Sequence, residues 1–105
     1  MDRWTDKNFD TEVIQNKLPV VVGFLREGCA ASEKMMAIWQ ELAQDQAGLV
    51  VGSVDIDTQP ATAEKYAIKS TPTTIIVHSG KVTHEFVGIR QKVEITSAVR
   101  ATINP

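Results

Sequence analysis

The chain has 105 residues, of which 43% are hydrophobic and 23% are charged, and its formal net charge is −2. These values are typical of one soluble globular domain, so we expect a single domain over residues 1–105. The small negative charge argues against nucleic acid or an anionic membrane as partner, and no apolar run approaches the roughly 20 residues of a membrane span.

The beginning of the chain predicts an edge strand, a short helix and a central strand. The edge strand is expected at Arg3-Trp4, and apolar residues at helical spacing indicate a helix over residues 8–16. The continuous apolar run VVVGFL, residues 20–25, is typical of a strand that is covered on both faces.

A longer helix and a second buried strand follow. Apolar residues at i, i+3, i+4, i+7 and i+8 predict an amphipathic helix from Cys29 to about Gln46, closed by Gly48. The stripe consists of Met35, Ile38, Trp39, Leu42 and Ala43. The run LVVGSVDID, residues 49–57, predicts a strand parallel to the first one, with a right-handed crossover between them.

The rest of the chain predicts a short helix, a hairpin and a final helix. Pro60 suits the first turn of a helix that ends near Tyr66. Residues 73–88 read as two antiparallel strands around the turn Ser79-Gly80, with Gly88 ending the second strand. Ile95, Ala98, Val99 and Ile103 form the apolar stripe of the last helix. The whole order predicts an α/β fold, a mixed sheet with helices on both faces.

Cys29 is the only cysteine, and it lies where the predicted central strand turns into a helix. In such folds, ligands and reactive groups gather at the carboxyl ends of the parallel strands. Unpaired backbone N–H groups at a helix start stabilise negative charge and favour the thiolate. We expect Arg26 to add a nearby cation, Ser32 to direct its hydroxyl at the sulfur, and Gly28 to leave the sulfur exposed.

Another interpretation of Cys29 is a small buried hydrophobic residue, because free cysteine is among the most buried residue types. The flanking Glu27-Gly28 and Ala30-Ala31 indicate that the chain reaches the surface here, and favour an accessible thiol. His78 and His84 are expected far from Cys29, so we predict no metal site.

Five segments of the sequence, taken together, resemble the thioredoxin family over nearly the whole chain. They are NFDTEVI, VVVGFLREGCAAS, VDID, KYAIKSTPTTIIVHSGKV and FVG. The resemblance implies a thioredoxin fold, with a mixed sheet of four or five strands between helices. It also implies that Thr71-Pro72 is a cis peptide that faces Cys29 and offers backbone groups to an extended substrate peptide. By the same resemblance, the expected substrate contacts are Gly28, Ala30, Ala31, Thr71, Pro72 and Gly88.

The chain departs from the family at residues that carry its chemistry. The usual turn is Trp-Cys-Gly-Pro-Cys, whereas here it is Gly28-Cys29-Ala30-Ala31-Ser32, so the resolving cysteine is a serine. The family's buried carboxylate falls at Gly23 and its lysine partner at Ser53. Either divergence or a substitution made to trap a mixed disulfide could produce Ser32; the other departures favour divergence.

These features predict a monothiol thioredoxin-like protein, an oxidoreductase or isomerase that lacks the resolving cysteine. Cys29 is the expected nucleophile and Ser32 its hydrogen-bond partner, acting on protein disulfides or glutathione mixed disulfides. No cofactor is expected apart from an external thiol such as glutathione. Two alternatives are a redox-inactive module that binds a partner protein through the same face, and a thiol-based redox sensor. A single cysteine needs no oxidising compartment, and MDRWTDKNFD lacks the apolar core of a signal peptide, so we expect a cytoplasmic protein.

Overall fold

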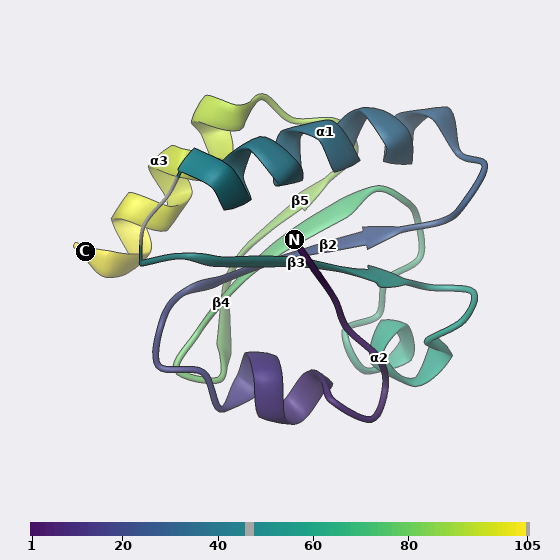
Figure 1. The fold of residues 1–105 in the computed structure, drawn as a ribbon, viewed down its shortest axis with the longest axis horizontal. Helices are drawn as coiled ribbons and strands as arrows, with labels where there is room; N and C mark the ends of the chain where they lie inside the picture. Colours follow the sequence, from purple (N-terminus) through teal and green to yellow (C-terminus); the bar gives the residue numbers. More distant parts are fainter. Residues whose placement is uncertain (46–47, 105) are drawn as a thin grey trace.

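Five strands form one mixed sheet in the order β1-β3-β2-β4-β5 in a computed structural model that describes residues 1–45 and 48–104 (Figure 1). The elements are β1 (Asp2–Arg3), η1 (Asp10–Ile14), β2 (Val20–Leu25), α1 (Ala30–Asp45), β3 (Val50–Asp55), α2 (Pro60–Lys65), β4 (Thr73–His78), β5 (Lys81–Val87) and α3 (Lys92–Ile103). Strands β1 and β2 run parallel to β3, whereas β4 runs antiparallel to both β2 and β5. This is the expected α/β thioredoxin fold.

Helices cover both faces of the sheet. In Figure 1, α1 and α3 lie above the sheet, while α2 and the short helix η1 lie below it. Strand β2 is buried along its whole length, because alternate side chains enter two separate hydrophobic clusters. Val21 points toward α1 and α3, and Val20 and Val22 point toward η1. The central strand is therefore held from both sides, which fixes where its carboxyl end lies.

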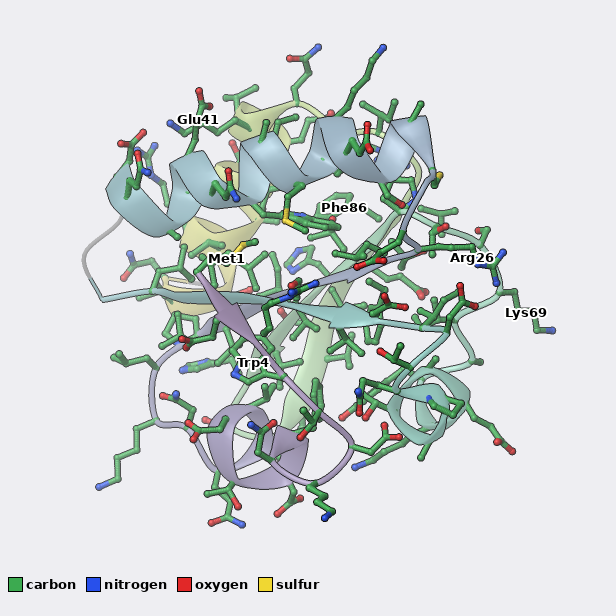
Figure 2. The ribbon with its side chains drawn as sticks, turned by 45° about the vertical axis from the view of Figure 1, so that its right-hand side comes forward. Met1, Trp4, Arg26, Glu41, Lys69 and Phe86 are labelled. Carbon is green, nitrogen blue, oxygen red and sulfur yellow. The ribbon has the colours of Figure 1, made fainter. Side chains whose placement is uncertain are left out.

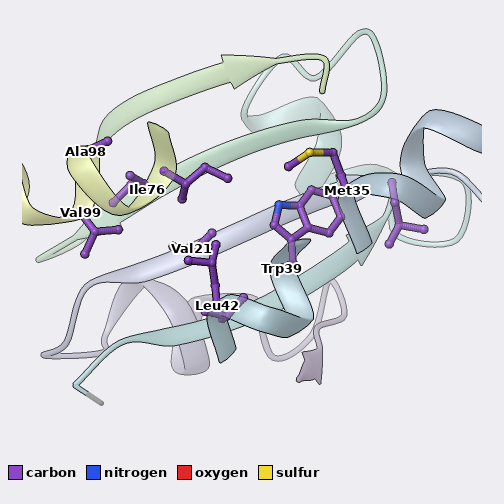
Figure 3. Packing of buried hydrophobic residues seen from close by; sticks show 10 residues of the cluster. Val21, Met35, Trp39, Leu42, Ile76, Ala98 and Val99 are labelled. Atoms are coloured by element: carbon purple, nitrogen blue, oxygen red, sulfur yellow. The ribbon is translucent and has the colours of Figure 1, made fainter. Parts of the chain in front are cut away.

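The upper cluster is built around the buried stripe of α1. Met35, Trp39 and Leu42 are each 0% exposed and pack against Val21 of β2 and Ile76 of β4, as Figure 3 shows. This confirms the predicted stripe. Ile38 and Ala43 are only partly buried and pack at its margin. The helix is thereby anchored along its length, and its first turn is presented at one end of the sheet.

The beginning of the chain differs from the prediction in detail. The expected helix over residues 8–16 is a short π-helix at Asp10–Ile14, where the Gln15 N–H donates to the Asp10 carbonyl at 3.0 Å. The edge strand is Asp2–Arg3 rather than Arg3-Trp4. Trp4 turns its side chain into the lower cluster on the η1 side of the sheet (Figure 2) and is 3% exposed.

Helix α1 ends at Asp45, and the predicted end at Gln46 lies outside the described residues. Gly48 has a φ of +76°, which suits the glycine expected after this helix. Within residues 1–45 and 48–104, no helix combines the length and the hydropathy that crossing a bilayer requires.

Candidate functional site

The turn between β2 and α1 sets the position of Cys29. The Cys29 N–H donates to the Arg26 carbonyl at 3.3 Å, and the Cys29 carbonyl accepts the Glu33 N–H at 3.0 Å, the first bond of the helix. Cys29 therefore occupies the capping position just before Ala30. Gly28 has a φ of +79°, a left-handed conformation that side-chain-bearing residues rarely adopt. The thiol is partly exposed, as the sequence predicted.

Ser32 lies one turn along α1, directly beside the thiol. Its side chain is buried, and its Oγ accepts the Arg26 N–H at 3.3 Å. That bond leaves the hydroxyl proton free to be donated. Hydrogen bonds from the side chain and the backbone N–H of Ser32 lower the pKa of Cys29, and burial opposes them only in part. The first turn of α1 thus stabilises the thiolate.

The loop before β4 forms the other side of the site. The Thr71–Pro72 peptide bond is cis, and a hydrogen bond from the Thr71 side chain also lowers the pKa of Cys29. The Pro72 carbonyl accepts the Gly88 N–H at 2.8 Å, which joins the end of β5 to this loop. The structure thus brings Cys29, Ser32, Thr71 and Gly88 to one end of the sheet. The contribution of the Thr71 hydroxyl was not foreseen, although its place before Pro72 was.

The expectation that Arg26 stabilises the thiolate is wrong. The Arg26 guanidinium lies against Asp57, with Nε at 3.1 and 3.2 Å from the two carboxylate oxygens, and Figure 2 shows it reaching outward. The low pKa of Cys29 comes from hydrogen bonds and not from this cation.

The position of the family's buried carboxylate is filled by an aromatic ring. A Cβ placed on Gly23 would lie 2.4 Å from Trp39 Cδ2, which is far inside van der Waals contact. The Trp39 Nε1–H donates to Thr74 Oγ1 at 3.0 Å, so the ring is held in one orientation. Ser53, at the position of the lysine partner, pairs with Gly23 in the register of β2 and β3 and is 2% exposed. No titratable base therefore lies behind the thiol at position 23.

A pocket of about 430 Å³ opens beside the thiol turn, between the start of α1 and the edge strand β1. Its lining includes Gly28, Ser32 and Met36, and Arg3 reaches it from β1. No sequence motif indicated this pocket. In the described part of the chain, no three His, Cys, Asp or Glu side chains come together as a metal ion would need.

Comparison with known proteins points to one family. The model of the family described as Thioredoxin matches residues 1–101. The thioredoxin of Rickettsia bellii is 35% identical over 89 residues, which cover 84% of this chain and 85% of that protein. The thioredoxin of Chlorobaculum thiosulfatiphilum is 34% identical, with 84% and 82% covered, and that of Rickettsia prowazekii is 30% identical, with 94% and 95% covered.

Proposed function

The chain belongs to the thioredoxin family, which acts in thiol–disulfide exchange, and we propose that it does so as a monothiol protein through Cys29. The observation that carries this proposal is the environment of the sulfur. The thiol is partly exposed, its pKa is lowered mainly by hydrogen bonding to Ser32, and Thr71 of the substrate-side loop also reaches it. A nucleophilic thiolate needs this combination of access and stabilised charge.

The reaction begins with attack of the Cys29 thiolate on one sulfur of a substrate disulfide. A bond forms between that sulfur and Cys29 Sγ, the substrate disulfide breaks, and the second substrate sulfur leaves as a thiolate. The backbone of Thr71, held in place by the cis bond to Pro72, is the proposed dock for the substrate peptide. Ala30 and Ala31 on the first turn, and Gly28 and Gly88 beside it, are the other proposed contacts.

The mixed disulfide must be released by a thiol from outside the chain, because Ser32 has no sulfur to attack it. We propose two routes. In the first, glutathione attacks Cys29 Sγ and frees the reduced substrate, and a second glutathione then regenerates the Cys29 thiolate as oxidised glutathione forms. In the second, the substrate's own free thiol attacks, which isomerises the substrate. Both routes suit a reducing compartment such as the cytoplasm.

A second candidate is a binding module without redox turnover. It is favoured by exposed apolar side chains on either side of Gly88, with Val87 53% and Ile89 50% exposed. In that case a partner protein would dock across Gly88 and the neighbouring loop, and Cys29 would not take part in thiol–disulfide exchange.

Reduction of insulin with glutathione as the sole reductant distinguishes the two candidates. The monothiol proposal expects turnover that disappears in Cys29→Ala and expects a trapped Cys29–insulin adduct when glutathione is withheld. If wild type and Cys29→Ala behave alike in both assays, the exchange proposal fails and the binding module is favoured.

A further inference from the structure

The pocket beside the thiol turn is bordered by Gly28, which has no side chain to enter it. The family's usual turn has tryptophan where this chain has Gly28. A Cβ at Gly28 would meet no atom within 4 Å, so the space next to it is open. Leu25 and Met36 supply apolar lining, and the volume of about 430 Å³ falls within the roughly 300–1,000 Å³ typical of small-molecule sites.

The pocket lies on the β1 side of β2, and the loop at Thr71 leads into β4 on the other side, so the two flank the thiol turn. The lining residues Gly28 and Ser32 are neighbours of Cys29, which does not itself line the pocket. Displacement at a disulfide proceeds with the attacking sulfur, the central sulfur and the leaving sulfur close to a line. With a substrate docked at Thr71 as proposed, its sulfur leaves toward that loop, and a thiol that attacks Cys29 Sγ approaches from the side of the pocket. Ser32, which lines the pocket, stands where the family's resolving sulfur stands and hydrogen-bonds the Cys29 sulfur.

Charges of both signs surround the opening. Arg3 makes only a 3.7 Å contact with Glu27, and its side chain is 71% exposed, so its guanidinium is accessible to an anion. Arg26 is already bound to Asp57. Glu33, on the first turn of α1, lines the same pocket and is exposed. Two cations, Arg3 and Arg26, and two carboxylates, Glu27 and Glu33, therefore line an opening whose apolar part is Leu25 and Met36.

We propose that this pocket binds the external thiol that resolves the mixed disulfide, and that this thiol is a small zwitterion such as a thiol-containing peptide. The inference rests on the proposed monothiol exchange. A carboxylate of the ligand pairs with Arg3, its ammonium group lies near Glu33, and its carbon chain covers Leu25 and Met36. Its thiolate attacks Cys29 Sγ, a new S–S bond forms, and the substrate sulfur leaves as a thiolate. A second molecule of the same thiol then reduces Cys29.

The test isolates this second stroke. Cys29 is first converted to its mixed disulfide with thionitrobenzoate, and release of the coloured anion is followed with either glutathione or 2-mercaptoethanol, which carries no charged groups. We expect the rate to saturate with glutathione and to stay linear with 2-mercaptoethanol. Arg3→Gln should lower the glutathione rate at low concentration about three- to fivefold, the value of one exposed charge pair, and leave the 2-mercaptoethanol rate unchanged.

Matched variants keep the test falsifiable. Arg100→Gln removes the same charge from an exposed position on α3. It should leave the ratio of the glutathione rate to the 2-mercaptoethanol rate at the wild-type value. Glu33→Gln should lower the ratio as Arg3→Gln does. If the release rate depends linearly on glutathione concentration, or if Arg3→Gln leaves the ratio unchanged, the proposal that the pocket binds the thiol is wrong. The proposed exchange reaction at Cys29 would not be affected by that result. Failure of both thiols to release the anion from wild type would overturn both proposals.

Discussion

The indole ring of Trp39 fills the space that any side chain at position 23 would enter. A Cβ on Gly23 would lie 2.4 to 2.5 Å from three atoms of that ring, and Trp39 itself is 0% exposed. The family's carboxylate and the tryptophan therefore cannot occupy this core together. The absence of a carboxylate at position 23 is therefore linked to the way α1 packs on the sheet. Restoring that carboxylate requires a change at position 23 and a second change at Trp39.

Gly23→Asp should destabilise the fold by at least about 2 kcal/mol, because it overpacks the core and buries a carboxylate. Combining it with Trp39→Leu should cost less than the sum of the two single changes, since the smaller side chain opens the space. Urea unfolding of the two single variants and the double variant gives this coupling. Gly23→Ala serves as the uncharged control. Strict additivity would show that the ring and position 23 do not compete.

The pKa of Cys29 should depend on Ser32 and not on Arg26. The rate of alkylation of Cys29 against pH should show its inflection below the value of a free cysteine, because hydrogen bonds favour the thiolate. Ser32→Ala should move the inflection upward, so that less thiolate is present at neutral pH. Arg26→Gln should leave it in place, because the guanidinium is paired with Asp57. The opposite ranking of the two variants would refute this account.

Ser32→Cys should restore a second thiol beside the first. Because Ser32 is buried next to the Cys29 sulfur, we expect an internal disulfide to form and mixed disulfides to decay at least about tenfold faster, as an intramolecular attack replaces a bimolecular one. Insulin reduction with dithiothreitol should then exceed the wild-type rate. Ser32→Ala is the control and should keep mixed disulfides long-lived. An unchanged lifetime in Ser32→Cys would mean that this position does not reach the sulfur.

Asp6 should make stability fall at acid pH. Its carboxylate accepts bonds from the Thr62 hydroxyl at 2.6 Å and the Thr62 N–H at 2.8 Å, and the pKa of Asp6 is lowered from 3.8 mainly by the Thr62 hydroxyl. A group with a depressed folded pKa contributes stability above its unfolded pKa and loses it as the pH falls through the folded value.

The matching measurement is the urea midpoint of wild type and Asp6→Asn against pH. Wild type should be the more stable protein at neutral pH. The two curves should converge as the pH falls from about 4 through the lowered folded pKa, below which the carboxylate is protonated in both states. Curves that run parallel down to pH 2 would contradict an ionised Asp6 that binds Thr62 at the start of α2.

Local patterns carried most of the fold. The apolar run of β2, the stripe of α1 and the glycine that ends the last strand each encode one element within a short stretch, because secondary structure follows periodicity and turn chemistry. The same holds for the site in outline. Cys29 at a strand-to-helix junction and Ser32 one helical turn later need no distant residue, and the position of Thr71 came from the resemblance to the family.

Only the tertiary structure decided which residues far apart in the chain contact one another. Arg26 meets Asp57, Asp6 meets Thr62, and Arg3 reaches the turn at Gly28 to form a pocket. The sequence showed a glycine at position 23 and a tryptophan at position 39, but not that one makes room for the other. Such pairings depend on how helices and strands pack, and periodicity along the chain contains no information about which side chain across the interface fills a given space.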